Sequence, residues 1–249
     1  MAEETNIPVI EVFGGEPRLA GCLPRKSKVG ELCPLFSGVV EDMTDAELAN
    51  AVGKVTLRHF ASIYDQDGKG SCAAEASDQA GSIARVVAGE PLILFNPWFM
   101  YRVTGGGRDA GSNIEDNLVF CRDQGMCPVS VWPRSKGLSR PSEEAIEEAK
   151  KYRILEFYDL TTVRQMRTAL AKGFPVVWGA NGHALCKVED QGPDKGLDAN
   201  SWGTGWGDNG FGVWTSYRGI QWGYGAFAVR VATSSSGEPV PKLDKGIMR

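Results

Sequence analysis

Apolar residues recur at helical spacing after position 72 of this chain. They are Ala73, Ala76, Ala80, Ile83, Ala84 and Val87. This pattern predicts a helix that starts at Cys72 and closes at Gly89-Glu90-Pro91. The same spacing predicts a second helix, from Ser112 or Asn113 to Gln124, with Gly125 behind it.

Polar start signals predict three shorter helices. Thr44 with Glu47, and Thr162 with Gln165, each match a capping box. The first of these helices is predicted to end near Gly53, and the other at Lys172-Gly173. Ser142, followed by two glutamates, predicts a further helix whose acidic residues lie at the positive end of its dipole.

Beyond Pro175 the pattern changes to short strands separated by turn residues. The predicted strands are 176–179, 183–189, 197–202, 210–216 and 226–232. Residues 55–64 alternate and predict a further strand or extended segment, and residues 1–40 predict an extended arm with short strands. Helices followed by antiparallel strands are typical of an α+β fold, so we expect two lobes with a functional cleft between them.

The chain divides into three predicted parts. Residues 1–54 form an N-terminal arm, residues 55–232 form the main domain, and residues 233–249 form a polar tail that begins Ser-Ser-Ser. The 249 residues carry 31 acidic and 27 basic side chains, a net charge of −4. With no Lys/Arg run, they predict no nucleic-acid partner.

The N-terminus lacks the basic and apolar regions of a signal peptide, and no apolar stretch approaches the ~18–20 residues of a membrane span. We therefore expect no membrane partner and a cytoplasmic location, with association with a virion left open. A reducing compartment favours free thiols. Under oxidising conditions, a disulfide between Cys22 and Cys33, or between Cys121 and Cys127, stays an open alternative.

Six cysteines and two histidines are the scarce reactive residues of the chain. The cysteines contain no C-x-x-C pair and no histidine lies near a matching pair, which argues against a structural zinc site. No metal and no cofactor is predicted. His59 has no partner of a catalytic kind nearby, so a structural role is favoured for it.

Cys72 follows Gly70-Ser71 at the predicted start of a helix, where free N–H groups and the helix dipole favour a thiolate. Gln66 lies six residues earlier in a glycine-rich loop. Its side-chain amide and the backbone N–H of Cys72 would together form an oxyanion hole.

His183 begins a predicted strand directly after an Asn181-Gly182 turn. Asn200 follows on the next strand, and one hairpin can bring the two side chains together. The amide oxygen of Asn200 would then orient the imidazole ring as a general base. An inert buried thiol at Cys72 is the alternative, which the joint presence of Gln66, His183 and Asn200 disfavours.

These segments resemble the papain-like cysteine peptidases, especially their compact bacterial and viral branch. The resemblance rests on Asp65-Gln66 through Cys72, on Gly182-His183-Ala184, and on Asn200 through Gly207 followed by Gly210-Phe211-Gly212. Two further segments agree: residues 111–116, and residues 125–128 with Trp132-Pro133. Five such motifs in family order, over roughly residues 55–232, are a specific signal.

The resemblance implies a two-lobed fold, with a helical N-terminal lobe and an antiparallel β-sheet or barrel-like C-terminal lobe. It implies a cysteine-type endopeptidase acting on peptide or protein substrates through Cys72, His183, Asn200 and Gln66. Ala110 and Gly111 would hydrogen-bond an extended substrate, and Ser71, Gly182 and Trp202 would line its site. Trp202 would also shield the contact between His183 and Asn200 from water.

The short segment just before His183 and the extra N-terminal arm keep other functions open. Lys69 and Ala73 replace residues that secreted relatives and papain carry, a change that fits a disulfide-poor intracellular branch. A thiol amidase or acyl transferase, and a catalytically weak structural or binding protein, remain as alternatives. Residues 1–54 are either an inhibitory pro-segment lying in the cleft or an arm docked on a partner or the other lobe.

Overall fold

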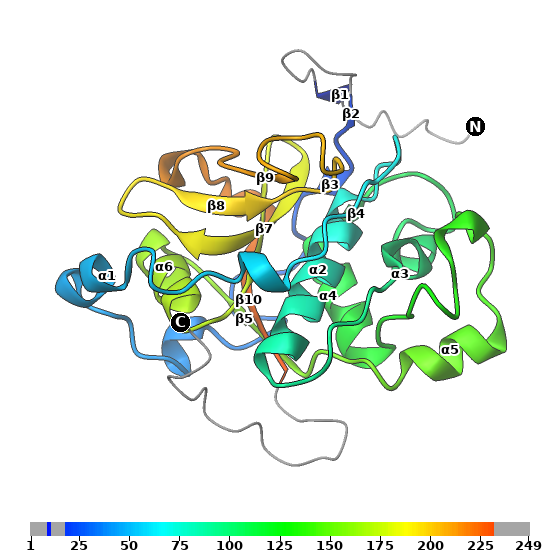
Figure 1. The fold of residues 1–249 in the computed structure, drawn as a ribbon, viewed down its shortest axis with the longest axis horizontal. Coiled ribbons are helices and arrows are strands. Elements are labelled where there is room, and N and C mark those ends of the chain that lie inside the picture. The colour runs from blue at the N-terminus through cyan, green and yellow to red at the C-terminus, as the bar shows by residue number, and fades with distance from the viewer. Residues whose placement is uncertain (1–8, 11–17, 232–249) are drawn as a thin grey trace.

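The computed structural model describes residues 9–10 and 18–231. Within that part of the chain, helices gather beside a twisted six-stranded sheet with the order β5-β10-β6-β7-β8-β9 (Figure 1). Every neighbouring pair in this sheet is antiparallel. The predicted α+β class is therefore confirmed.

The elements follow the chain in a simple order. The strands of the large sheet are β5 (Glu156–Asp159), β6 (Val176–Ala180), β7 (His183–Asp190), β8 (Gly196–Ala199), β9 (Phe211–Gly212) and β10 (Ala226–Arg230). Two small sheets pair β1 (Val9–Ile10) with β2 (Arg18–Leu19), and β3 (Cys22–Leu23) with β4 (Ser112–Asn113). The α-helices are α1 (Asp45–Ala51), α2 (Cys72–Val87), α3 (Pro97–Thr104), α4 (Ile114–Asp123), α5 (Glu143–Ala149) and α6 (Val163–Ala171).

The alanine-rich helix α2 lies at the centre of the molecule, between the sheet and the other helices of its lobe (Figure 1). It packs against β7 on one side and against α3 and α4 on the other. Its residues from Cys72 to Arg85 are all buried. Small side chains let the helix backbone approach both neighbours closely, so the first turn of α2 is fixed where the two lobes meet.

The predicted helix starts are confirmed, with one change of detail. Thr44 and Glu47 form a complete capping box at the start of α1. Thr162 accepts the N–H of Gln165 at 3.1 Å, but the Gln165 side chain reaches Thr161 instead of Thr162. Ser142 caps α5 through the N–H of Ala145.

Residues 55–64 were predicted as a strand or an extended segment, and the strand is wrong: none forms there, and the segment contains the 3-10 helix Arg58–Phe60. Both edges of β7 are already paired, with β6 and β8. The segment therefore reaches β7 only at the bulge between Lys187 and Glu189, where the N–H of Leu57 donates to the carbonyl of Val188. A strand needs a free edge, and none is available here.

Two predicted strands are shorter than expected. β8 ends at Ala199, and β9 contains only Phe211 and Gly212. After β8 the chain leaves the sheet and turns toward the helical lobe, where the N–H of Gln66 donates to the carbonyl of Ser201 at 2.8 Å. This departure brings the end of β8 to the loop that precedes α2.

The arm contributes side chains to the core of the molecule. Phe36 and Leu48 are fully buried, and Cys22 and Cys33 are nearly so. The predicted tail 233–249 lies outside the described residues, and the domain boundaries stay predictions. No helix in the described ranges has the length and apolar character needed to cross a membrane.

Candidate active site

Cys72 is the first residue of α2, and its side chain is completely buried. Burial raises the pKa of the Cys72 thiol to about 11, although backbone groups of Ala184, Gly21 and Ala73 lower it. Ala184 directly follows His183 on β7, so the sulfur lies beside the start of that strand. Burial therefore favours the protonated form of this thiol.

His183 begins β7 after a tight turn in which Asn181 and Gly182 both have positive φ. Its Nε2 lies 2.7 Å from Oδ1 of Asn200, which also accepts the N–H of Ser201 at 2.8 Å. Because Oδ1 is an acceptor, Nε2 carries the proton and donates it. Nδ1 is then the unprotonated nitrogen, and it has no hydrogen-bond partner among the described residues.

Aromatic rings enclose the imidazole of His183. The ring of Trp202 lies 4.7 Å from it, and the ring of Trp214 lies 5.1 Å from it. Burial lowers the pKa of His183 to about 4, and the hydrogen bond to Asn200 offsets only part of this shift. Trp214 therefore encloses His183 together with Trp202, and no sequence pattern linked Trp214 to this site.

The side chain of Gln66 is buried and has a defined orientation. Its Oε1 accepts hydrogen bonds from Oγ of Ser201 at 2.9 Å and from Nε1 of Trp202 at 3.1 Å. Its Nε2 therefore faces the opposite way, and donates to the carbonyl oxygens of Lys69 and, at 3.2 Å, Leu19. These contacts fix the orientation of the Gln66 amide in the loop that precedes Cys72, where Nε2 donates to two backbone carbonyls.

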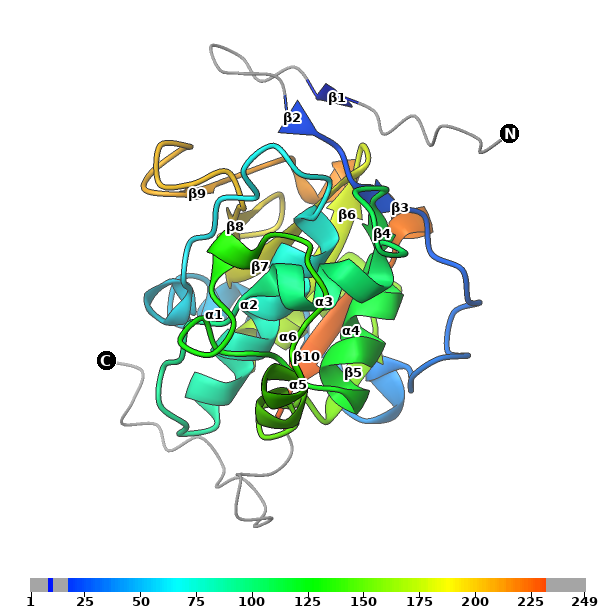
Figure 2. The same ribbon diagram turned by 90° about the vertical axis from the view of Figure 1, so that its right-hand side faces the viewer.

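The N-terminal arm passes through this site. The N–H of Cys22 donates to the carbonyl of Gly182 at 2.7 Å, and the N–H of Ser112 donates to the carbonyl of Gly21 at 2.9 Å. β3 of the arm lies parallel to β4, which Figure 2 shows beside it. A Cβ atom at Gly21 would lie only 1.8 Å from the carbonyl oxygen of Gly70, so the arm backbone presses directly on the nucleophile loop.

The predicted substrate-binding residues differ in what they contact. Gly182 and Gly111 lie against the arm: a Cβ atom at Gly111 would be 2.7 Å from the carbonyl oxygen of Gly21. The N–H of Gly111, however, donates to the hydroxyl of Tyr101 at 2.9 Å, while half-buried Ala110 precedes it. Ser71 directs its hydroxyl to Glu75, at 3.0 Å, and therefore away from the cleft.

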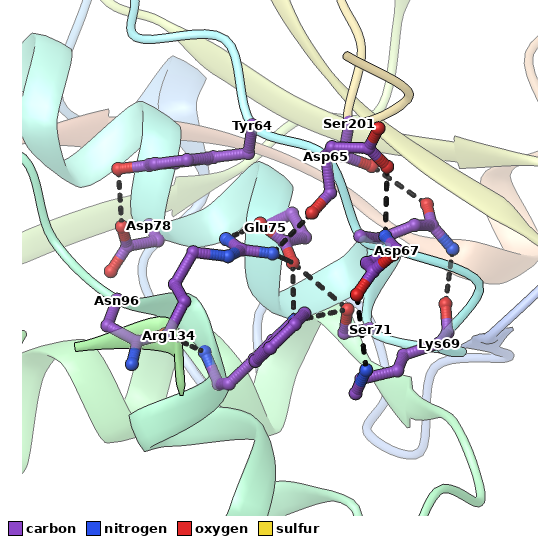
Figure 3. Close-up of polar contacts among 12 residues, drawn as sticks. Tyr64, Asp65, Asp67, Lys69, Ser71, Glu75, Asp78, Asn96, Arg134 and Ser201 are labelled. Carbon is purple, nitrogen blue, oxygen red and sulfur yellow. Dashed lines mark hydrogen bonds and ion pairs between the residues drawn. The ribbon is translucent and has the colours of Figure 1, made fainter. Parts of the chain in front are cut away.

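A polar cluster behind Cys72 was missed by the sequence reasoning. Glu75, one helical turn after Cys72, is buried and binds Arg134 (Figure 3). These two residues are 59 positions apart, and no local pattern links them.

His59 is exposed in the 3-10 helix Arg58–Phe60, and all six cysteines are free thiols. Among the described residues no cluster of histidine, cysteine and acidic side chains could hold a metal ion.

No protein-family model matches the sequence, and no curated protein matches it either. Solved structures do match its fold. Xylellain, a cysteine protease from Xylella fastidiosa, superposes with a TM-score of 0.69 at 21% identity, over 86% of this chain and 96% of its own.

Two further solved structures match the fold of this chain with lower TM-scores. Digestive procathepsin L 3 of Tenebrio molitor has a TM-score of 0.62 at 16% identity, over 82% of this chain and 75% of its own. The Carica candamarcensis cysteine protease CMS1MS2 has a TM-score of 0.56 at 17% identity, over 71% of this chain and 97% of its own. At these identities the likeness concerns architecture, and it agrees with the helix and sheet arrangement described above. The chain therefore has the papain-like cysteine protease fold.

Proposed function

We propose that this chain is a cysteine peptidase that hydrolyses peptide bonds, with Cys72 as nucleophile and His183 as general base. The observation that carries the proposal is the fixed tautomer of His183. Asn200 binds Nε2 and leaves Nδ1 as a free acceptor in a buried site, on the strand that lies beside the Cys72 sulfur. A base needs this arrangement to take the proton of a thiol.

The remaining residues supply the other steps of the reaction. Nδ1 of His183 accepts the thiol proton, and the sulfur of Cys72 attacks the peptide carbonyl carbon. Nε2 of Gln66 and the N–H of Cys72 donate hydrogen bonds to the resulting oxyanion. The C–N bond then breaks as His183 protonates the leaving amine, and water, deprotonated by His183, hydrolyses the thioester to a carboxylic acid and the free thiol.

The test is hydrolysis of a set of fluorogenic peptides, together with mass-spectrometric mapping of thiols alkylated by iodoacetamide. Cys72→Ala is expected to abolish hydrolysis and to remove the fastest-alkylated site. Cys127→Ala, which removes another buried thiol far from His183, serves as the matched control and should keep both. Hydrolysis that survives Cys72→Ala would overturn the proposal.

We also propose that residues 19–23 keep the site closed. The carbonyl of Leu19 occupies the donor Nε2 of Gln66, and Gly21 and Cys22 cover the nucleophile and the turn before His183. Under this cover both Cys72 and His183 are completely buried. Burial favours the neutral thiol and the neutral imidazole, which is the resting state of the pair.

The chain beyond this segment is firmly anchored. Arg25 pairs with the buried carboxylate of Asp159 at 2.8 Å and with Glu115 at 3.3 Å, and Phe36 is fully buried in the core. Opening therefore requires displacement of a short segment ending before Arg25, while the rest of the arm stays in the fold.

Gly21→Ala in the full chain tests this closure, because the added methyl group cannot fit against Gly70. The variant should expel the segment and raise both hydrolysis and Cys72 alkylation by roughly tenfold or more, since about 1.4 kcal/mol of lost contact changes a population tenfold. Gly38→Ala is the control, because a Cβ atom there meets nothing within 4 Å. Equal rates in the two variants would contradict the closure.

A further inference from the structure

A buried carboxylate with no part in the proposed reaction lies directly behind the nucleophile. Glu75 is 0% exposed and receives four hydrogen bonds. Nη1 and Nη2 of Arg134 donate to its two oxygens at 3.1 Å each, Oγ of Ser71 donates at 3.0 Å, and Nε1 of Trp98 donates at 2.9 Å. Burial raises the pKa of Glu75, and the contacts with Arg134, Ser71 and Trp98 lower it again.

A buried ion pair seldom stabilises a helix more than apolar packing of the same volume, because removing both charges from water costs free energy. A specific geometric role accounts for it better. Ser71, which Glu75 holds, is the residue before Cys72, so the carboxylate fixes the start of α2 from behind (Figure 3).

Arg134 connects this carboxylate to the loop that carries Gln66. Nη2 of Arg134 also donates to the backbone carbonyl of Asp65, the residue before Gln66 (Figure 3). One guanidinium therefore holds both ends of the segment 65–71: Asp65 directly, and Ser71 through Glu75. Arg134 itself comes from the 3-10 helix Arg134–Lys136, which is separate from α2.

The indole ring of Trp98 contacts both Arg134 and the loop that carries Gln66. The guanidinium of Arg134 lies 4.1 Å from the centre of its ring, and the ammonium of Lys69 also lies 4.1 Å from it. Lys69 in turn accepts a hydrogen bond from Nε2 of Gln66 through its carbonyl. The loop is thus supported at Asp65, Lys69 and Ser71 by one planar cation, one carboxylate and one indole.

We propose that Arg134 is a positioning residue for the oxyanion hole, a role that rests on the proposed peptidase function. By fixing segment 65–71, it keeps Nε2 of Gln66 aligned with the N–H of Cys72. The planar guanidinium can bind both carboxylate oxygens and the Asp65 carbonyl at once. A lysine ammonium keeps the charge but cannot reproduce this geometry.

The experiment compares Arg134→Lys with Arg140→Lys, an exposed arginine of the same lobe, in the full chain and in the full chain carrying Gly21→Ala. Peptide hydrolysis gives kcat and KM, and alkylation by iodoacetamide gives the reactivity of the Cys72 thiol. Alkylation is a displacement at carbon that forms no oxyanion. Arg134→Lys should therefore lower kcat by roughly tenfold or more, with KM and alkylation within about twofold of the parent.

A second background decides whether the effect passes through Gln66. Gln66→Ala alone should lower kcat by roughly 100-fold, and adding Arg134→Lys to it should cost little more, because the donor to be positioned is gone. Unchanged kcat in Arg134→Lys, full additivity with Gln66→Ala, or a parallel fall in alkylation would overturn the inference alone. Failure of every parent chain to hydrolyse peptides would overturn the proposed function, and the inference with it.

Discussion

The two sides of the candidate site are held by different kinds of contact. On the helix side, the thiol loop is supported by charged groups, with Arg134 and Glu75 paired at 3.1 Å behind Cys72. On the sheet side, His183 is held by a neutral amide at 2.7 Å and enclosed by the rings of Trp202 and Trp214. Charge therefore supports the loop that we propose forms the oxyanion hole, while neutral and aromatic groups surround the proposed general base.

This difference has a physical reason. A fixed charge beside the imidazole would bias its pKa strongly in a site of low dielectric, whereas an amide oxygen orients the ring with a smaller effect. A buried ion pair of the sheet contacts this aromatic enclosure through Trp214. Lys187 and Asp198 pair at 2.8 Å, and Asp198 also accepts the N–H of Trp214, which lies on the His183 ring.

The largest expected effect comes from breaking that buried pair. Lys187→Met leaves Asp198 as an unpaired buried carboxylate, which should lower the free energy of unfolding by about 3–5 kcal/mol. Urea denaturation followed by tryptophan fluorescence measures it. The double variant Lys187→Met with Asp198→Asn removes the unpaired charge and keeps one amide oxygen as the acceptor for Nε1 of Trp178, so it should recover part of the loss. A double variant as unstable as the single one would contradict this account.

The next effect concerns the neutral hydrogen bond itself. Asn200→Ala removes the acceptor of Nε2, so the imidazole can rotate and the tautomer is no longer fixed. Peptide hydrolysis should fall by roughly 10- to 100-fold, because small misplacements of a catalytic group cost this much. Asn209→Ala, an exposed asparagine on the following turn, is the control. Wild-type rates for Asn200→Ala would show that the aromatic enclosure alone orients the ring.

The last prediction tests the polar character of the helix side. Burial raises the pKa of Asp78 to about 8, whereas a carboxyl in the unfolded chain has a pKa of about 4. The folded state therefore binds more protons between these values, and the stability contributed by Asp78 falls as the pH rises from about 4 to about 8. Asp78→Asn keeps an oxygen for the hydroxyl of Tyr64 and removes this titration.

The measurement is the difference in Tm between Asp78→Asn and the parent chain at pH 5 and pH 8. The variant should gain relative to the parent as the pH rises. The opposite shift of His183, whose pKa is lowered to about 4, is present in both chains and cancels in the difference. A difference in Tm that stays constant across this range would show that Asp78 is ionised in the fold.

Local signals predicted much of the fold. The helices α1, α2, α4, α5 and α6 and the strands β6 and β7 were found from spacing and end signals alone. α3 was missed, although Asn96 caps it and Pro97 opens it, because the segment is short and its apolar residues are nearly continuous. β5 was missed because only four residues form it, and its pairing with β10 joins distant parts of the chain.

The contacts of the candidate site likewise divide into local ones, which could be predicted from the sequence, and long-range ones, which could not. The expected approach of Asn200 to His183 is present because one hairpin brings them together. The contacts of Arg134 with Glu75, and of Leu19 with Gln66, join segments far apart in sequence, and no periodicity encodes them. Ser71 illustrates the limit: its neighbour Cys72 suggested a role in the cleft, but its hydroxyl is directed to Glu75 by tertiary packing.

The order of strands in the large sheet has a consequence for how the protein forms during synthesis. Among the strands of the described residues β10 comes last in sequence, yet it lies between β5 and β6. Until residues 226–230 leave the ribosome, the facing edges of β5 and β6 stay unpaired, and the sheet that carries His183 is incomplete. The sheet that supports His183 is therefore completed only after β10 has emerged and paired with β5 and β6.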